Sequence, residues 1–175
     1  LSKNFNNLSL LGENIIIAGS AVLDKSLSDF AINNSLSGFE FLSCIPGTVG
    51  GGIKMNAGCF GKEFKDLLLS IQTIDIFGNI TTLPTEKIKF EYRKTNLPDD
   101  LFFLSASFRG VKGDKKEIKN MTDELKLKKE KAQPTMIKTS GSTFKNPISQ
   151  TKKKVWELIQ ESVPLEKSFG DACIS

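Results

Sequence analysis

The sequence predicts an α+β protein. Three observations support this prediction: short segments rich in β-branched and aromatic residues, longer stretches with apolar residues every three to five positions, and a length of 175 residues, which is enough to bury a core. No apolar run approaches the roughly 20 residues that span a bilayer, so we expect no membrane contact. The N-terminus has neither an initiator Met nor a long apolar region, so we expect no signal peptide and a chain cut from something longer.

Each expected element follows from a local pattern. Residues 14–18 are mostly β-branched and end at a glycine, which predicts a strand. Apolar residues from 22 to 36 have helical spacing, and Ser37-Gly38 would close that helix. Gly78-Asn79 joins two apolar segments and predicts a hairpin. The full set comprises strands at 14–18, 66–77, 80–83 and 101–108, helices over 22–36, 113–131 and 152–161, a helical turn at 85–86, and the beginning of a strand at 169–175.

Composition excludes several kinds of site. The chain has no histidine, which rules out a Ser-His or Cys-His catalytic pair from its own residues. Cys44, Cys59 and Cys173 have no CxxC spacing, so we expect no disulfide, no metal site and a reducing, cytoplasmic location. The formal charge is only +4 and most lysines alternate with acids, so we do not expect a nucleic-acid partner.

The most informative segment is the glycine-rich run 45–61. Glycine accepts positive φ and has no Cβ, so such a run lets main-chain N–H groups converge on an anion, and we expect a loop around the phosphates of a cofactor. The spacing is not GxGxxG, and Gly47-x4-Gly52 lacks the Lys and Ser/Thr of a P-loop. Asn56 beside Ala57-Gly58 suits contact with a flat polar ring. A tight turn packed under a helix stays an alternative.

Two further positions suggest chemistry. Arg93 is one of only two arginines, and its planar guanidinium would clamp a carboxylate; a surface ion pair is the alternative. Ser142 lies in a polar loop, 139–147, that would bind phosphate and hold a hydroxyl ready to donate a proton; a turn residue or helix cap is the alternative. On local pattern alone we expect Tyr92 to be a packing residue and Cys59 to be a small filler and not a nucleophile.

Together these segments resemble one family, the UDP-N-acetylenolpyruvoylglucosamine reductases, flavoenzymes that make UDP-N-acetylmuramate for bacterial peptidoglycan. The segments similar to its second FAD-binding motif are 36–42, 45–51 and 55–58. Residues 90–93 are similar to its arginine motif, and residues 133–134 with 141–147 are similar to its serine motif. Residues 170–175 are similar to a later Gly-Gly-Ala-x-Val-Ser segment of the family. The motifs follow the family's order over nearly the whole chain.

The resemblance implies a reaction in two halves: NADPH gives a hydride to FAD, and the reduced flavin passes it to the enolpyruvyl group of a UDP-sugar. It implies that Ser142 is the general acid and that Arg93 stabilises the developing enolate. Tyr92, Lys145 and Asn146 would bind the substrate. The implied cofactor-binding residues are Ile45, Pro46, Gly47, Thr48, Gly50, Gly51, Asn56, Ala57 and Gly58.

The resemblance also implies a domain organisation. Residues 1–112 would form the second FAD-binding subdomain, with a mixed or antiparallel sheet and helices; 113–133 would connect it to 134–175, the start of an α+β substrate-binding domain. The family's first FAD-binding subdomain and its third active-site residue, a glutamate, match nothing in the chain, and Cys44 and Asp171 replace family glycines. We therefore expect a fragment that binds FAD weakly by itself. A non-catalytic remnant and another FAD-linked oxidoreductase stay open as alternatives; no protein partner is indicated.

Overall fold

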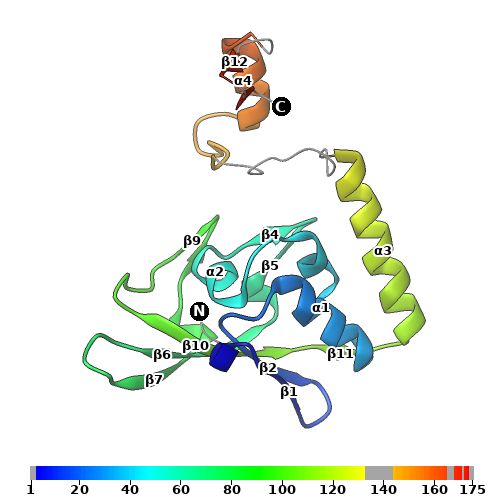
Figure 1. Cartoon of the computed structure of the whole chain (residues 1–175), viewed down its shortest axis with the longest axis vertical. Coiled ribbons are helices and arrows are strands. Elements are labelled where there is room, and N and C mark those ends of the chain that lie inside the picture. The colour runs from blue at the N-terminus through cyan, green and yellow to red at the C-terminus, as the bar shows by residue number, and fades with distance from the viewer. Residues whose placement is uncertain (1–2, 133–143, 165–167, 171, 174–175) are drawn as a thin grey trace. The chain divides into compact units, whose positions relative to one another are not determined.

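The computed structural model describes residues 3–132, 144–164, 168–170 and 172–173 (Figure 1). The chain divides into unit 1, Leu1–Gln133, and unit 2, Pro134–Ser175. Unit 1 contains the five-stranded sheet, and the described residues of unit 2 form a helix and a short hairpin.

The centre of unit 1 is a five-stranded antiparallel sheet in the order β1-β2-β10-β6-β7 (Figure 1). The predicted α+β class and the strands expected at 14–18, 66–77, 80–83 and 101–108 are therefore confirmed. The sequence gives little sign of β1, because that strand is short, lies at an edge and has no β-branched residue. The strands are β1 (Leu8–Leu11), β2 (Ile15–Gly19), β6 (Leu68–Ile74), β7 (Ile80–Pro84) and β10 (Phe102–Arg109).

The predicted hairpin between β6 and β7 is held by one carboxylate. Asp75 Oδ1 accepts the main-chain N–H groups of Phe77 and Asn79, both at 2.9 Å. The Asn79 side chain donates to Asp75 Oδ2, also at 2.9 Å. These hydrogen bonds, led by that of the Asn79 side chain, lower the pKa of Asp75.

The pairing of β6 with β10 contains two irregularities that offset each other. Leu104 of β10 has no partner in β6, and Leu69 of β6 has no partner in β10. The Leu104 carbonyl instead accepts the N–H of Ser20 at 3.0 Å. This bond continues the register in which Ser105 pairs with Gly19, so it ties β10 to the chain that follows β2.

Two helices, α1 (Asp24–Asn33) and α2 (Val49–Lys54), lie on the same side of the sheet (Figure 1). The helix expected over 22–36 is shorter than predicted. It ends at Asn33 because the Asn34 side chain donates to Phe30 O at 2.8 Å and Ser35 takes a φ of +56°.

The two residues after that turn form a strand of their own. Leu36–Ser37 is β3, and it pairs with β11 (Val111–Lys112). The remaining short elements of unit 1 are η1 (Lys3–Phe5), η2 (Glu40–Cys44), η3 (Phe64–Asp66), η4 (Thr85–Lys87), β4 (Gly58–Cys59), β5 (Lys62–Glu63), β8 (Phe90–Glu91) and β9 (Lys94–Thr95).

The hydrophobic core lies between the sheet and these helices. Side chains of β2, β10 and β6 point alternately to the two faces of the sheet, and one set enters the core. Phe108 of β10 belongs to this set and is fully buried. Phe108 packs edge-on against Phe39 and Phe64, with ring centroids 6.4 and 5.9 Å apart, and Phe64 meets Phe41 at 6.5 Å. Such T-shaped pairs add roughly 0.5–1.5 kcal/mol each beyond the area they bury.

The helix α3 (Lys115–Ala132) packs on unit 1 through its N-terminal half. Asp114 Oδ1 begins it by accepting the N–H groups of Lys116 and Glu117 at 2.9 and 3.0 Å. Ile118 and Thr122 are buried, and Leu125 packs against the core. The helix expected over 113–131 is confirmed. Its connecting role stays a prediction, and the structure adds that its apolar face contributes to unit 1.

Unit 2 contains α4 (Val155–Ser162), β12 (Ser168–Phe169) and β13 (Ala172–Cys173). The Lys154 N–H donates to the Glu157 carboxylate at 2.6 Å, which stabilises the first turn of α4. The helix expected over 152–161 is confirmed. The single strand expected from residue 169 is wrong, because a turn at Gly170 divides this segment between β12 and β13.

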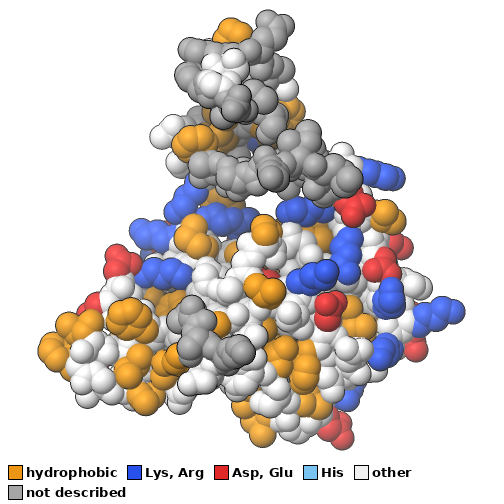
Figure 2. All heavy atoms as spheres, viewed as in Figure 1, with side chains coloured by type: hydrophobic (Ala, Val, Ile, Leu, Met, Phe, Trp, Pro, Cys, Tyr) orange, Lys and Arg blue, Asp and Glu red, His pale blue; other side chains and the backbone are white. Residues whose placement is uncertain are grey.

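The surface of unit 1 carries an apolar cluster at one end of the sheet. Figure 2 shows hydrophobic side chains gathered over the β6–β7 hairpin, where Ile76, Phe77 and Ile80 are exposed. Among the helices in the described part of the chain, we find none with the length and hydropathy of a membrane-spanning segment.

Candidate active site

The glycine-rich segment 45–61 is only partly a loop. Its centre, Val49–Lys54, is the helix α2, so the loop expected for these residues is wrong. The reason is tertiary packing: a Cβ on Gly52 would lie 2.3 Å from the Phe64 ring, so only glycine lets the helix approach that ring. The Ala57 N–H donates to Gly52 O at 2.8 Å and closes the helix.

Two N–H groups expected to face an anion are used inside the protein. Val49 donates to Val22 O and Gly50 to Ser20 O, both at 2.9 Å. The alternative of a tightly packed turn therefore describes this part of the segment better than a phosphate loop does. Of the predicted cofactor-binding residues, Pro46, Gly47 and Gly51 are exposed, whereas Ile45, Thr48, Gly50, Ala57 and Gly58 are half-buried.

Three buried polar side chains lie between the end of β2 and the middle of α1, and two of them, Ser20 and Asp24, are next to this segment. Within the described part of the chain, Ser20 Oγ, both carboxylate oxygens of Asp24, and Ser28 Oγ have no hydrogen-bond partner. The Asp24 side chain is fully buried, and a Cβ on Gly47 would lie 3.1 Å from its Oδ2. Burial raises the pKa of Asp24 from 3.8 to about 7. Asp24 therefore changes its protonation near neutral pH, directly behind the exposed Gly47.

Arg93 reaches back to the glycine-rich segment. It lies in the two-residue turn between β8 and β9 with a φ of +55°. Its Nη2 donates to Gly58 O at 2.6 Å and its Nη1 to Asn56 O at 3.2 Å. The guanidinium carbon lies 4.9 Å from the centroid of the Tyr92 ring, in cation–π geometry. The structure thus brings Tyr92 and Arg93 together with two predicted cofactor-binding residues.

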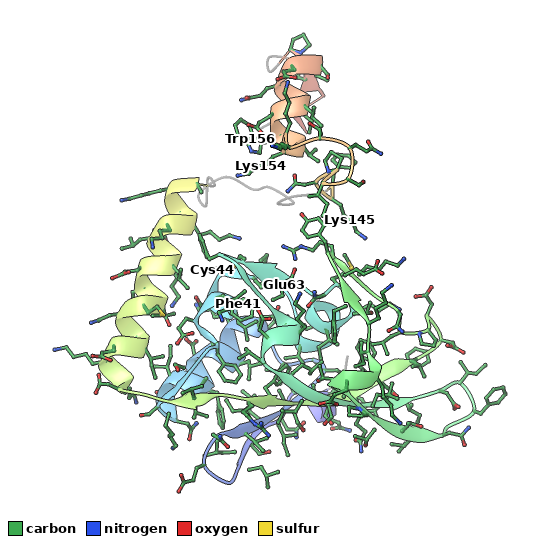
Figure 3. All side chains as sticks on the ribbon, turned by 180° about the vertical axis from the view of Figure 1, so that it is seen from behind. Phe41, Cys44, Glu63, Lys145, Lys154 and Trp156 are labelled. Carbon is green, nitrogen blue, oxygen red and sulfur yellow. The ribbon has the colours of Figure 1, made fainter. Side chains whose placement is uncertain are left out.

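A residue that the sequence does not single out joins the same cluster. Glu63 Oε2 accepts the Asn56 side-chain amide at 2.9 Å, and Glu63 Oε1 lies 3.6 Å from Arg93 Nη1 (Figure 3). Asn56 is fully buried; its side chain also donates to Glu91 O at 3.2 Å and accepts the N–H of Lys65 at 3.2 Å. No local signal marks Glu63, because its partners are distant in sequence.

A pocket of about 390 Å³ opens beside this cluster. Its walls are the β4–β5 hairpin, Arg93, Lys65 and Asp66. Cys59 in the same hairpin donates to Phe41 O at 3.3 Å, and burial, reinforced by Cys44, raises the pKa of the Cys59 thiol to about 11. A thiol with that pKa is a poor nucleophile at neutral pH, which agrees with the expected filler role.

Unit 2 carries the remaining predicted site residues. Ser142 lies outside the described residues. Lys145 is exposed (Figure 3). Asn146 Oδ1 accepts the N–H of Val155 at 3.0 Å, so the Asn146 side chain supports the start of α4. In the described ranges, no group of three or more His, Cys, Asp or Glu side chains is arranged to hold a metal.

Residues 1–84 match a family model described as "FAD binding domain". The antiparallel sheet, the helices on one side and the packed glycine-rich segment therefore belong to the class of FAD-binding domains.

Matches that extend over the whole of this chain narrow the class to one family. The chain is 66% identical to the UDP-N-acetylenolpyruvoylglucosamine reductase of Pelagibacter ubique (strain HTCC1062) and 44% identical to that of Rickettsia typhi, in each case over all of this chain and 58% of that protein. The crystal structure of the Thermus caldophilus reductase superposes with a TM-score of 0.78 at 31% identity, covering 92% of this chain and 57% of that one. The chain belongs to the UDP-N-acetylenolpyruvoylglucosamine reductase family, and it spans about 58% of the length of these curated relatives.

Proposed function

We propose that this chain forms part of an NADPH-dependent flavoenzyme that reduces UDP-N-acetylglucosamine enolpyruvate to UDP-N-acetylmuramate. The observation that carries the proposal is the position of Arg93. Its guanidinium donates to the main chain of Asn56 and Gly58, so the arginine motif lies against the flavin motif. This arrangement supports the proposal, because a fixed cation beside the flavin site would suit the charge that develops in the reaction.

The residues present fit the polar half of FAD. Exposed Gly47 and Gly51 leave the main chain accessible without a Cβ in the way. Behind them Ser20 Oγ and the Asp24 carboxyl are buried polar groups that lack partners within the described residues. Gly47, Gly51 and Thr48 would hold the nucleotide, whereas the buried side-chain amide of Asn56 is used by Glu63, Glu91 O and the N–H of Lys65. When bound, FAD supplies hydride transfer between NADPH and the enolpyruvyl carbon.

The chain's own residues supply charge stabilisation and a proton. Arg93 would stabilise negative charge that develops beside the substrate carboxylate, since an oriented guanidinium acts strongly where water is scarce. Ser142 would give a proton to the carbon next to the hydride acceptor. Tyr92, which lies under the guanidinium, and Lys145 and Asn146 would bind the UDP-sugar. A cytoplasmic location accompanies this proposal, supported by the free thiols of Cys44 and Cys59.

The test separates the two half-reactions in the whole protein that carries this segment. Ser142→Ala should leave reduction of the flavin by NADPH unchanged and slow its reoxidation by the enolpyruvyl UDP-sugar by about 100-fold or more. Ser149→Ala, an exposed serine of the same unit, is the matched control and should slow neither step. Equal loss of both half-reactions in Ser142→Ala would contradict the assigned role.

A second measurement separates this activity from that of another FAD-linked oxidoreductase. The reduced whole protein is mixed with the enolpyruvyl UDP-sugar or with a simple hydroxy acid, and flavin absorbance is followed. Reoxidation by the UDP-sugar supports the proposal. Reoxidation by the hydroxy acid and not by the UDP-sugar would contradict the proposal and favour another FAD-linked oxidoreductase. No bound flavin in the whole protein would favour a non-catalytic remnant.

A further inference from the structure

We infer that Glu63 is a positioning residue for Arg93: its carboxylate ties the guanidinium to the glycine-rich segment. This inference rests on the role proposed above for Arg93. Glu63 stands at the end of β5, Arg93 in the β8–β9 turn, and Asn56 directly after α2. Three separate segments of unit 1 therefore meet at one carboxylate.

The contacts of Glu63 divide its two oxygens between two tasks. Oε2 accepts the Asn56 amide at 2.9 Å, which holds the carboxylate in place. Oε1 then lies 3.6 Å from Arg93 Nη1. Both ends of this pair are largely removed from solvent, with side-chain exposures of 27% for Arg93 and 23% for Glu63. A partly buried pair with a second anchoring hydrogen bond fixes orientation better than a pair between two mobile surface chains.

The backbone around the pair is strained in a way that requires support. Asn56 and Arg93 have φ values of +40° and +55°, in the region that favours glycine. Non-glycine residues remain there only where surrounding contacts hold them. The contacts that do so here are the Arg93 hydrogen bonds to Asn56 O and Gly58 O and the carboxylate of Glu63.

This geometry leaves part of the guanidinium available. The two hydrogen bonds to main-chain carbonyls use one N–H of Nη1 and one of Nη2, and a guanidinium has further N–H groups. Arg93 also lines the pocket beside the β4–β5 hairpin. Glu63 thus holds one side of the guanidinium, and the remaining N–H groups would be available to a ligand in this pocket. Its pair with Lys65, at 2.9 Å, is more exposed and contributes little to this arrangement.

The chain offers a direct measurement, because Arg93 and Arg109 are its only arginines. In the 175-residue chain with isotope-labelled arginine, NMR of the guanidinium Nη groups reports how freely each one rotates. We expect separate, slowly exchanging Nη signals for Arg93 and averaged signals for the exposed Arg109. Glu63→Gln should average the Arg93 signals and leave Arg109 unchanged. Glu91→Gln, which removes an exposed carboxylate paired with Lys89, is the matched control and should change neither.

Two outcomes decide the inference. Averaged Arg93 signals in Glu63→Gln, with unchanged circular dichroism, support it. Unchanged Arg93 signals would overturn it, because the two carbonyls would then hold the guanidinium without Glu63. If Glu63→Gln does not fold, Glu63→Asp takes its place: its charge is kept but its reach is one methylene shorter, and the same loss at Arg93 is expected.

The whole protein with FAD gives the functional readout. Glu63→Gln should slow flavin reoxidation by the enolpyruvyl UDP-sugar by between about tenfold and about a hundredfold, the scale of a displaced catalytic group, with flavin reduction by NADPH unchanged. An unchanged reoxidation rate would contradict the positioning role. A wild-type protein that the UDP-sugar fails to reoxidise would contradict the proposed function instead, while the NMR result still decides how Arg93 is held.

Discussion

Asp24 is expected to make the stability of unit 1 depend on pH near neutrality. The side chain is fully buried without a hydrogen-bond partner among the described residues, and burial raises its pKa from 3.8 to about 7. Between these two values the folded chain binds a proton that the unfolded chain releases, so the free energy of unfolding falls as pH rises through this range. The whole pKa shift corresponds to a loss of about 4 kcal/mol in the free energy of unfolding, and about 3 kcal/mol of this loss occurs between pH 5 and pH 8.

The assay is urea unfolding of the ligand-free chain at several pH values between 5 and 8.5, for the wild type and for Asp24→Asn. The amide cannot ionise, so the variant should gain stability over the wild type by up to about 3 kcal/mol as pH rises from 5 to 8. Asp29→Asn, an exposed carboxylate on the same helix, is the matched control and should follow the wild type. Parallel curves for wild type and Asp24→Asn across this range would refute the reasoning, because Asp24 would then have a partner or contact with water.

Three other predictions follow from packing and burial. Gly52→Ala would place a methyl group 2.3 Å from the Phe64 ring and should lower the free energy of unfolding by about 1–3 kcal/mol. Gly51→Ala is the control: its methyl group would lie 3.8 Å from the nearest atom, so it should be neutral or stabilising. Equal effects of the two variants in thermal unfolding would contradict this account. Phe108→Ala should cost about 3–5 kcal/mol, since it empties the centre of the aromatic cluster; a cost under about 1 kcal/mol in urea unfolding would show that the core refills the space. The Cys59 thiol, with its pKa raised to about 11, should react with iodoacetamide much more slowly at pH 7.5 in the folded chain than in urea, and similar rates would disprove its burial.

The sequence predicts the sheet better than it predicts the glycine-rich segment. Strands such as β2 and β10 carry their signal locally, in β-branched and aromatic residues and in the turns that bound them. The helix α2 has no such signal, because three of its six residues are glycine, the poorest helix former after proline. It forms because Gly52 fits against Phe64, a contact that becomes visible only when the chain has folded.

The residues of the candidate site likewise differ in how far the sequence predicts them. Arg93 is identified because arginine is rare in this chain and because its surroundings match a family motif. Glu63 is one of many acids and stands out only through its partners, Asn56 and Arg93. Asp24 is equally hidden, since nothing in its local sequence indicates that the carboxyl will be buried without a partner. Periodicity reports which face a residue takes, whereas these roles depend on which distant segments meet.

The offset irregularities between β6 and β10 mark where each of these strands can lose a residue. Leu69 and Leu104 are each one residue in excess of the partner strand, so the pairing is in step both before and after them. Because neither residue has a partner, deleting either one would remove its own irregularity and leave the paired residues on both sides of it in their present register. Deleting both would restore a regular ladder with the register intact at each end, although the Leu104 carbonyl that holds Ser20 would be lost. Either strand can therefore lose its extra residue without a matching loss from the other, whereas loss of a paired residue would shift the register beyond it and turn the following side chains to the opposite face.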